Sequence, residues 1–302
     1  MSSAASSGRA IVDGSARAWV STLGRVAVAA ITVIAITAVM AFLMLPIVAL
    51  VTYQPVHDLI HGFGTKVASD AIKVSLKTNA IAFVLMIGFG TPVAYVLGRS
   101  RFRGRSVVLT LIELPLVMPP AVAGIALLVA FGPDGLLGGT LNTFAITNPV
   151  FAQSAVVMCV LFVASPFYMR GAIAAFEAVD PTLIDVAGTL GAGSLRRMVR
   201  VAVPLAAGGL GAAGAVAFAR GIGEFGATIL FAGSLQGSTQ TLPLAVYFDF
   251  SGDNIDGAVA IGVLLLLVSA AILLTSKLLP RLWTSSTSTS TSRGARSIFA
   301  PR

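Results

Sequence analysis

The sequence predicts an all-α integral membrane protein with six transmembrane helices, on the strength of its composition, its long apolar runs and the position of its basic residues. Of the 302 residues, 56% are hydrophobic and 11% are charged, whereas a soluble domain has about 25% charged residues. A hydrophobic core stops growing near this chain length, so a water-soluble fold could not bury so much apolar surface. A bilayer removes that difficulty, because about 20 apolar residues in a helix cross a hydrocarbon layer of about 30 Å.

The long apolar runs define the six spans. They cover residues 26–52, 72–98, 106–131, 150–170, 201–232 and 258–280. Pro115, Pro119 and Pro120 predict a kink in the third span, since proline lacks a backbone N–H and clashes with the preceding helical turn. The fifth run is too long, and too often interrupted by glycine, to form one simple helix.

The basic residues predict that both termini are cytoplasmic, because lysine and arginine gather on the cytoplasmic side of membrane proteins. They are concentrated in the N-terminal segment, in the loops after the second and fourth spans, and at the C-terminal end. These residues are Arg9, Arg17 and Arg25; Arg99, Arg101, Arg103 and Arg105; Arg170, Arg196, Arg197 and Arg200; and Lys277, Arg281, Arg293, Arg296 and Arg302. An even number of spans independently places both termini on one side. This distribution explains the net charge of +8 without a nucleic-acid partner.

The ends of the chain differ in composition from its centre. Residues 1–24 are largely small and polar, and residues 283–302 begin with a Ser/Thr repeat. Such segments bury too little apolar surface to offset the entropy of ordering. We therefore expect two disordered cytoplasmic tails around a transmembrane domain at residues 25–282, with a long cytoplasmic loop at residues 171–204. The single cysteine, Cys159, lies in an apolar run and cannot form an internal disulfide.

The long loop predicts a helix outside the membrane. Asp180 followed by Pro181 is typical of a helix start, with aspartate as the N-cap and proline at the first helical position. Apolar residues then recur near helical spacing at Ile184, Ala187, Leu190, Leu195 and Met198. Such an amphipathic helix could lie on lipid headgroups or dock in a groove on a partner protein.

Three segments of this loop carry a defined spacing: residues 185–187, the glycine at 191 and residues 201–204. The pattern resembles the EAA loop of ABC importer permeases, which reads Glu-Ala-Ala, three residues, Gly, nine residues, Ile-x-Leu-Pro. Here Asp and Val replace the Glu and the first Ala, and Val replaces both Ile and Leu. The resemblance implies a coupling helix in a cleft of a cytoplasmic ATPase, with Gly191 allowing a tight turn or a close approach. The implied coupling residues are Asp185, Val186, Ala187, Gly191, Val201 and Pro204.

The resemblance to this family extends over about residues 70–280. The segments that carry it are 90–95, 101–105, 114–120, 165–168, 176–180, 223–228 and 239–247. The last two, GEFGAT and TQTLPLAVY, are more similar to molybdate and tungstate permeases than to sulfate permeases. This resemblance implies the type I ABC importer permease fold, in the plasma membrane of a prokaryote.

The same resemblance implies the function and the partners. The chain would be a permease subunit that carries a tetrahedral oxyanion, molybdate or tungstate, by alternating access. Its implied partners are a second permease copy, two ATP-binding subunits that use ATP and Mg, an extracytoplasmic oxyanion-binding protein, and membrane lipid. The sequence has no phosphate-binding loop of the Gly-x-x-x-x-Gly-Lys-[Ser/Thr] type, so we expect no enzymatic activity and no directly bound cofactor. The alternatives are a sulfate or thiosulfate ABC permease and a secondary anion transporter.

Ionisable residues inside the fifth span are candidates for the translocation path or its gate. Arg220 and Glu224 are four residues apart, a spacing that permits direct contact on a helix. They could form an ion pair that satisfies both groups, or Arg220 could attract a dianion while Glu224 shapes a gate. The candidate path residues are Arg220, Glu224, Phe225 and Thr228.

No catalytic or metal site is expected. His57 and His61 have the spacing of a zinc-protease helix, but the residue that follows His57 is Asp rather than Glu, and no third ligand is evident. Solvated loop histidines are therefore the better interpretation. Glu113 lies near the cytoplasmic end of the third span, where we expect a contact with headgroups or a neighbouring span rather than with an anion.

Overall fold

The computed structural model describes residues 4–138 and 150–285, and all regular elements within these ranges are helices. The chain separates into two compact units, Met1–Pro55 and Val56–Arg302. The first unit contains the helix α1 (Ala4–Thr52), whose apolar stretch Val28–Thr52 has no buried residue. Residues 4–24, expected to be a disordered tail, continue the first span as helix. Extending a helix that is already nucleated costs far less than starting one. Most of the expected C-terminal tail, residues 286–302, lies outside the described residues.

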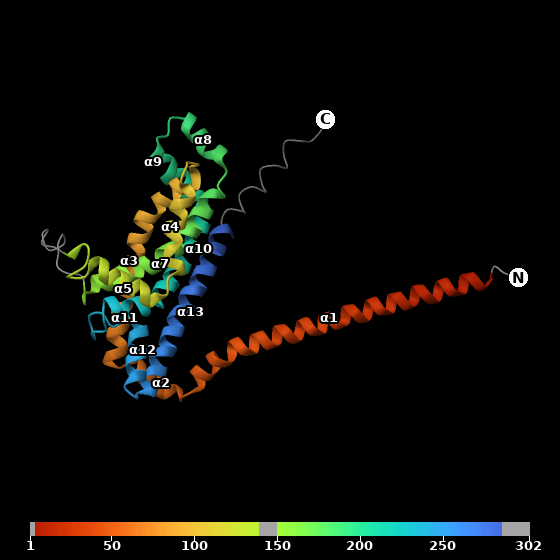
Figure 1. The fold of residues 1–302 in the computed structure, drawn as a ribbon, viewed down its shortest axis with the longest axis horizontal. Helices are drawn as coiled ribbons and strands as arrows, with labels where there is room; N and C mark the ends of the chain where they lie inside the picture. The colour runs from red at the N-terminus through yellow and green to blue at the C-terminus, as the bar shows by residue number, and fades with distance from the viewer. Residues whose placement is uncertain (1–3, 139–149, 286–302) are drawn as a thin grey trace, which may run out of the picture. The chain divides into compact units, whose positions relative to one another are not determined.

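The second unit contains the remaining helices and can be followed in Figure 1. They are α2 (Val56–Phe63), α3 (Lys66–Arg99), α4 (Arg105–Val117), α5 (Pro120–Phe131), α7 (Gln153–Glu177), α8 (Pro181–Thr189), α9 (Ser194–Arg197), the π-helical turn η1 (Met198–Ala202), α10 (Val203–Ile222), α11 (Gly226–Phe231), α12 (Leu242–Ser251) and α13 (Ile255–Ser285). Helices α8 and α9 lie at one end of this unit, and α2 and α12 lie at the other.

Five of the six predicted spans overlap single apolar helical stretches, although the stretch that matches the fifth span begins earlier than predicted, at Ser194, and ends at Ile222. Five stretches of the described helices are long and apolar enough to cross a membrane: Val28–Thr52, Lys66–Arg99, Gln153–Glu177, Ser194–Ile222 and Ile255–Thr275. The third predicted span is divided between α4 and α5, which are apolar enough only when taken together and are bent by 113° at the break between them. The chain is therefore a multi-pass membrane protein.

The bend in the third span is larger than the predicted kink. Met118, between α4 and α5, has an extended backbone with φ −74° and ψ 130°, as expected of a residue before proline. Pro119 is also extended, and Pro120 starts α5. Two consecutive prolines leave no helical path through residues 118–119, so the span divides into two helices.

The fifth run is also interrupted, as predicted, because α10 ends at Ile222 and α11 begins only at Gly226. The two interruptions meet in space. A Cβ atom on Gly226 would lie 2.7 Å from the Cβ of Pro120, closer than real side chains approach. Glycine at this position therefore lets the start of α11 pack directly on the start of α5.

The centre of the second unit lies between α3, α7 and α10. Tyr168 and Phe176 on α7 are almost completely buried. The Tyr168 hydroxyl and the Thr91 hydroxyl on α3 form a hydrogen bond of 2.6 Å. Tyr95 on α3 packs edge-on against Phe176, with ring centroids 5.4 Å apart. These contacts fix α3 against α7 and place the long loop at the end of this helix pair.

Candidate functional site

The long loop starts with a capped helix, as its sequence predicted. The Asp180 carboxylate accepts a hydrogen bond of 2.9 Å from the Thr182 amide, and Pro181 occupies the first turn of α8. Hydrogen bonding from the backbone and the side chain of Thr182 lowers the pKa of the exposed Asp180 carboxyl below its ordinary value. The cap therefore stabilises α8 above the ordinary pKa of aspartate, and this contribution is lost as the pH falls through the lowered pKa.

The helix α8 ends in a Schellman motif centred on Gly191. The Ala192 amide donates to the Ala187 carbonyl, and the Gly191 amide donates to the Gly188 carbonyl, both at 3.0 Å. Gly191 has φ +82°, and a Cβ atom added to it would meet nothing within 4 Å. The structure therefore shows the tight turn expected at Gly191, and no other described part of the chain approaches this residue closely.

The predicted amphipathic helix does not continue to Met198, because this turn ends α8 at Thr189. Ile184 is buried, at 3% exposure, and faces the protein. Leu183, Val186 and the C-cap residue Leu190 are exposed at 49%, 51% and 82%, and their i, i+3, i+7 spacing places them on one side of α8 and its end. We refer to Leu183, Val186 and Leu190 as the outer face of α8. Such a cluster is typical of a protein or membrane contact.

The remaining implied coupling residues divide between the loop and the next span. Asp185 is exposed beside the outer face, and Ala187 is half-buried. Val201 lies in η1, where it packs against the main core, and Pro204 stands at the start of α10. The π-helical geometry of η1 was not predicted. Single π turns often occur at functional sites, but the short run of residues here has no sequence signature for one.

Arg197 joins the two short loop helices, a role that the sequence did not reveal. A Cβ atom on Gly188 would lie 3.2 Å from Nη1 of Arg197, so the guanidinium packs closely over the C-terminal part of α8. A positive charge at that end of a helix is favoured by the helix dipole. The absence of a side chain at Gly188 gives Arg197 room to lie there.

The candidate path residues lie around the interruption in the fifth span. Nη2 of Arg220 and Oε2 of Glu224 are 2.8 Å apart, and the Glu224 side chain is 1% exposed. The other carboxylate oxygen, Oε1, accepts a hydrogen bond of 2.8 Å from the Ala227 amide. Glu224 therefore joins the end of α10 to the start of α11 through two contacts. The structure contains the ion pair considered for these residues.

Phe225 and Thr228 complete this group. The Phe225 ring lies 5.1 Å from the Tyr247 ring of α12, and Thr228 on α11 is buried. The neighbouring segment Thr239–Leu242 is buried as well, and the Leu242 amide donates to the Ser75 hydroxyl of α3 at 2.8 Å. The two segments that carried the narrower family resemblance therefore pack together around the interruption.

A cavity of about 630 Å³ lies between α3, α4, α5 and α7. Its lining is almost entirely apolar, and it contains none of the candidate path residues. An apolar cavity offers no ligands to an oxyanion, so it adds no candidate to this group.

The remaining polar candidates are on the surface. The rings of His57 and His61 are 4.5 Å apart, and His57 pairs with its neighbour Asp58. Among the described residues, no group of three or more His, Cys, Asp or Glu side chains is placed to hold a metal ion. Glu113 lies 3.8 Å from Arg170 on α7, and both side chains are exposed.

The chain matches known transport proteins over most of its length. The family model described as "Binding-protein-dependent transport system inner membrane component" matches residues 90–281. The molybdenum transport system permease protein ModB of Mycobacterium tuberculosis is 43% identical over 210 residues, which cover 70% of this chain and 79% of ModB. The probable transport system permease protein NifC of Clostridium pasteurianum is 33% identical over 237 residues, which cover 78% of this chain and 82% of NifC.

A solved structure shares the fold. It is a bacterial alginate ABC transporter in complex with a periplasmic protein that carries an alginate pentasaccharide. One of its chains is 17% identical and superposes with a TM-score of 0.68, covering 84% of this chain and 94% of the matched chain. At this identity the likeness concerns the fold alone.

The Schellman motif predicts that Gly191 tolerates only residues that adopt positive φ. Replacing Gly191 with Val costs about 1–2 kcal/mol in the left-handed region, so amide exchange in α8 should accelerate by about 5–30-fold. Hydrogen exchange of the purified protein in detergent measures this change. Gly191→Asn should remain near wild type, and Gly193→Val is the matched control because Gly193 has φ −64° and open space around it. Equal exchange in Gly191→Val and Gly193→Val would contradict the prediction.

The ion pair at the interruption predicts a large loss of stability when Glu224 is removed. Glu224→Ala leaves Arg220 and the Ala227 amide without their partner, and breaking a buried pair costs about 3–5 kcal/mol. Glu224→Gln should lose less, since its amide oxygen can still accept from Ala227. Unfolding midpoints in detergent measure both variants. Glu113→Ala is the control, because the exposed contact between Glu113 and Arg170 contributes under about 1 kcal/mol. A Glu224→Ala variant as stable as Glu113→Ala would contradict the prediction.

Proposed function

The chain belongs to the family of binding-protein-dependent transport system inner membrane components, and from this premise we propose that it carries molybdate through the membrane as the permease subunit of an ABC importer. Tungstate is the second candidate cargo, because both are tetrahedral dianions. The proposal is supported by relatives of 43% identity from Mycobacterium and 36% identity from Haloferax volcanii that are named as molybdenum permeases. The alternative is a sulfate or thiosulfate permease, and the uptake experiment below distinguishes it from a molybdate permease.

The observation that carries the coupling role is the outer face of α8. Leu183, Val186 and Leu190 are exposed on a short helix fixed at both ends, by the Asp180 cap and the Gly191 turn. We infer that this face docks in a cleft of a separate ATP-binding subunit, one copy for each of two permease chains. That subunit would bind ATP and Mg, and the permease itself would bind no cofactor.

The arrangement of charges supports the proposed orientation. Arginines gather in the segments 99–105 and 196–200, and these segments lie at the end of the second unit that carries α8 and α9 (Figure 1). Positive charge favours the cytoplasmic side, so we propose that this end faces the cytoplasm and that both termini are cytoplasmic. The opposite end, with α2 and α12, would then receive cargo from an extracytoplasmic binding protein.

The energetics of the cargo define what the path must provide. Moving a bare dianion into hydrocarbon costs tens of kcal/mol in idealised estimates, so the path must be polar or hydrated and open to one side at a time. We propose that ATP-driven closure of the two ATPase subunits moves the α8 helices and switches the spans between the two openings. The path would run between two copies of the chain, past the group formed by Arg220, Glu224, Phe225 and Thr228.

Competition for uptake tests the cargo. Proteoliposomes that contain the permease, its ATPase and its binding protein should import labelled molybdate only when ATP is supplied. Excess tungstate should compete strongly with labelled molybdate. An equal excess of sulfate should leave most of the molybdate uptake unchanged, because these tetrahedral dianions differ mainly in size. Competition by sulfate as strong as that by tungstate would overturn the molybdate assignment and retain the ABC permease. Molybdate uptake driven by an ion gradient without ATP would overturn the ATP-driven mechanism and retain the cargo.

Charges placed on the outer face of α8 test the docking role. Val186→Glu and Leu190→Glu should each weaken binding of the ATPase subunit by about tenfold or more, since burying one such side chain contributes about 1.5–3 kcal/mol. The binding is measured with the purified permease in detergent. Ser194→Glu is the matched control, because it adds the same charge at an exposed position of α9, outside this face. Unchanged binding in both outer-face variants would contradict the docking site.

A further inference from the structure

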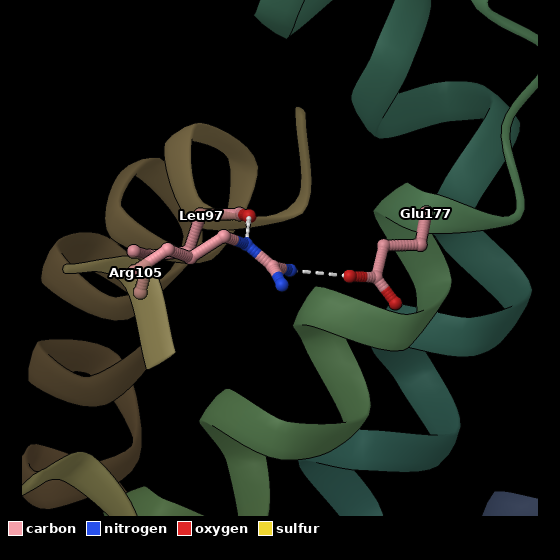
Figure 2. Close-up of polar contacts among 3 residues, drawn as sticks. All are labelled: Leu97, Arg105 and Glu177. Carbon is pink, nitrogen blue, oxygen red and sulfur yellow. Dashed lines mark hydrogen bonds and ion pairs between the residues drawn. The ribbon is translucent and has the colours of Figure 1, made fainter. Parts of the chain in front are cut away.

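The turn between α3 and α4 holds the end of α7 through arginine side chains. Arg105 donates from Nε to the Leu97 carbonyl at 2.8 Å, and its Nη2 forms an ion pair with Oε1 of Glu177 (Figure 2). Nearby, Nη1 of Arg99 donates to the Val179 carbonyl at 3.1 Å. Arg105 and Arg99 thus connect the second span and the start of the third to the chain just before α8.

Helix dipoles do not explain this placement. Arg105 is the first residue of α4 and Glu177 is the last residue of α7. A cation is disfavoured at a helix N-terminus and an anion at a helix C-terminus. Each charge therefore sits at the unfavourable end of its own helix and is stabilised by the other. The Leu97 carbonyl gives a second reason for the position of Arg105. It belongs to the last turn of α3, has no partner within that helix, and accepts the bond from Arg105.

The connection between these residues and α8 is short and packed. Ala178, Val179 and Asp180 separate Glu177 from the first residue of α8. Val179 is 7% exposed and belongs to the main core with Leu97 and Ile184. The chain cannot bend freely between the ion pair and α8, because Val179 is buried and its carbonyl is bonded. A displacement of α8 must therefore move the end of α7.

We propose that Arg105 and Glu177, supported by Arg99, form a clamp that transmits the displacement of α8 to α3 and α4. The inference rests on the proposed coupling role of α8. Without the clamp, the end of α7 could follow α8 while the α3–α4 turn stayed behind. With it, the second, third and fourth spans move together. The three residues touch neither cargo nor ATP and act as positioning residues.

The clamp makes a prediction that a purely structural role does not. The Arg105 and Glu177 side chains are 27% and 48% exposed, so the pair contributes little to global stability and its variants should assemble. In proteoliposomes with ATPase and binding protein, Glu177→Gln and Arg105→Gln should hydrolyse ATP near the wild-type rate. The number of molybdate ions imported per ATP should fall by about fivefold or more, the lower limit of a typical coupling energy.

Two further variants test whether the effect comes from the contact between Arg105 and Glu177. The double variant Arg105→Gln/Glu177→Gln should lose no more coupling than either single variant, because the two residues act through one contact. Arg103→Gln is the matched control, since Arg103 is exposed in the same turn and forms no ion pair with a described residue. It should keep the wild-type ratio of uptake to hydrolysis.

Each outcome bears on one proposal. An unchanged ratio in both single variants overturns the clamp and leaves the permease function intact. An equal fall in hydrolysis and uptake also overturns it, because the pair would then only support the fold. A wild-type transporter without ATP-dependent uptake overturns the proposed function instead. If Glu177→Gln fails to assemble, Arg99→Gln replaces it, since that change removes the bond to the Val179 carbonyl and leaves the Arg105–Glu177 pair in place. The number of molybdate ions imported per ATP then decides in the same way.

Discussion

The structure depends on one constraint, which is that backbone N–H and C=O groups inside a bilayer must find partners within the protein. Unbroken helices meet it automatically, but the third and fifth spans are interrupted. At the fifth span, the Glu224 carboxylate meets the constraint by accepting from the Ala227 amide while it pairs with Arg220. The start of α11 can then pack on the start of α5 at Gly226 and Pro120. One buried carboxylate therefore supports the region where both interrupted spans meet.

At the end of the second unit that carries α8, the structure must instead hold a short, exposed helix in place. There the helix is short and its outer face is left exposed, so its position depends on contacts at its two ends. Asp180 and Gly191 define where α8 begins and ends, Arg197 packs over it, and Ile184 anchors its inner face. Arg105 and Glu177 hold the chain that leads into it. A rigid element with an exposed apolar face suits the proposed transfer of motion from a partner into the spans.

Much of this was predictable because the signals are local. Long apolar runs located the spans, the Asp180–Pro181 pair located the start of α8, and glycine at 191 indicated a turn. The 113° bend at Pro119 was underestimated, since proline spacing shows that a helix is disturbed but not how far. The helix predicted to reach Met198 was too long, because apolar spacing continues across the turn at Gly191. The pairing of Arg105 with Glu177 was not predicted, as it joins residues 72 positions apart.

The pairing of Arg220 with Glu224 has a consequence for how long an anion would stay beside it. An isolated guanidinium at low dielectric would form a deep electrostatic well, from which a dianion would escape slowly. A guanidinium already matched to a carboxylate at 2.8 Å presents a dipole with no net charge. Transport requires binding sites that release as readily as they accept. On the path proposed above, a neutral pair of this kind would keep the dwell time of a passing dianion short, and tight capture would fall to the proposed binding protein outside the membrane.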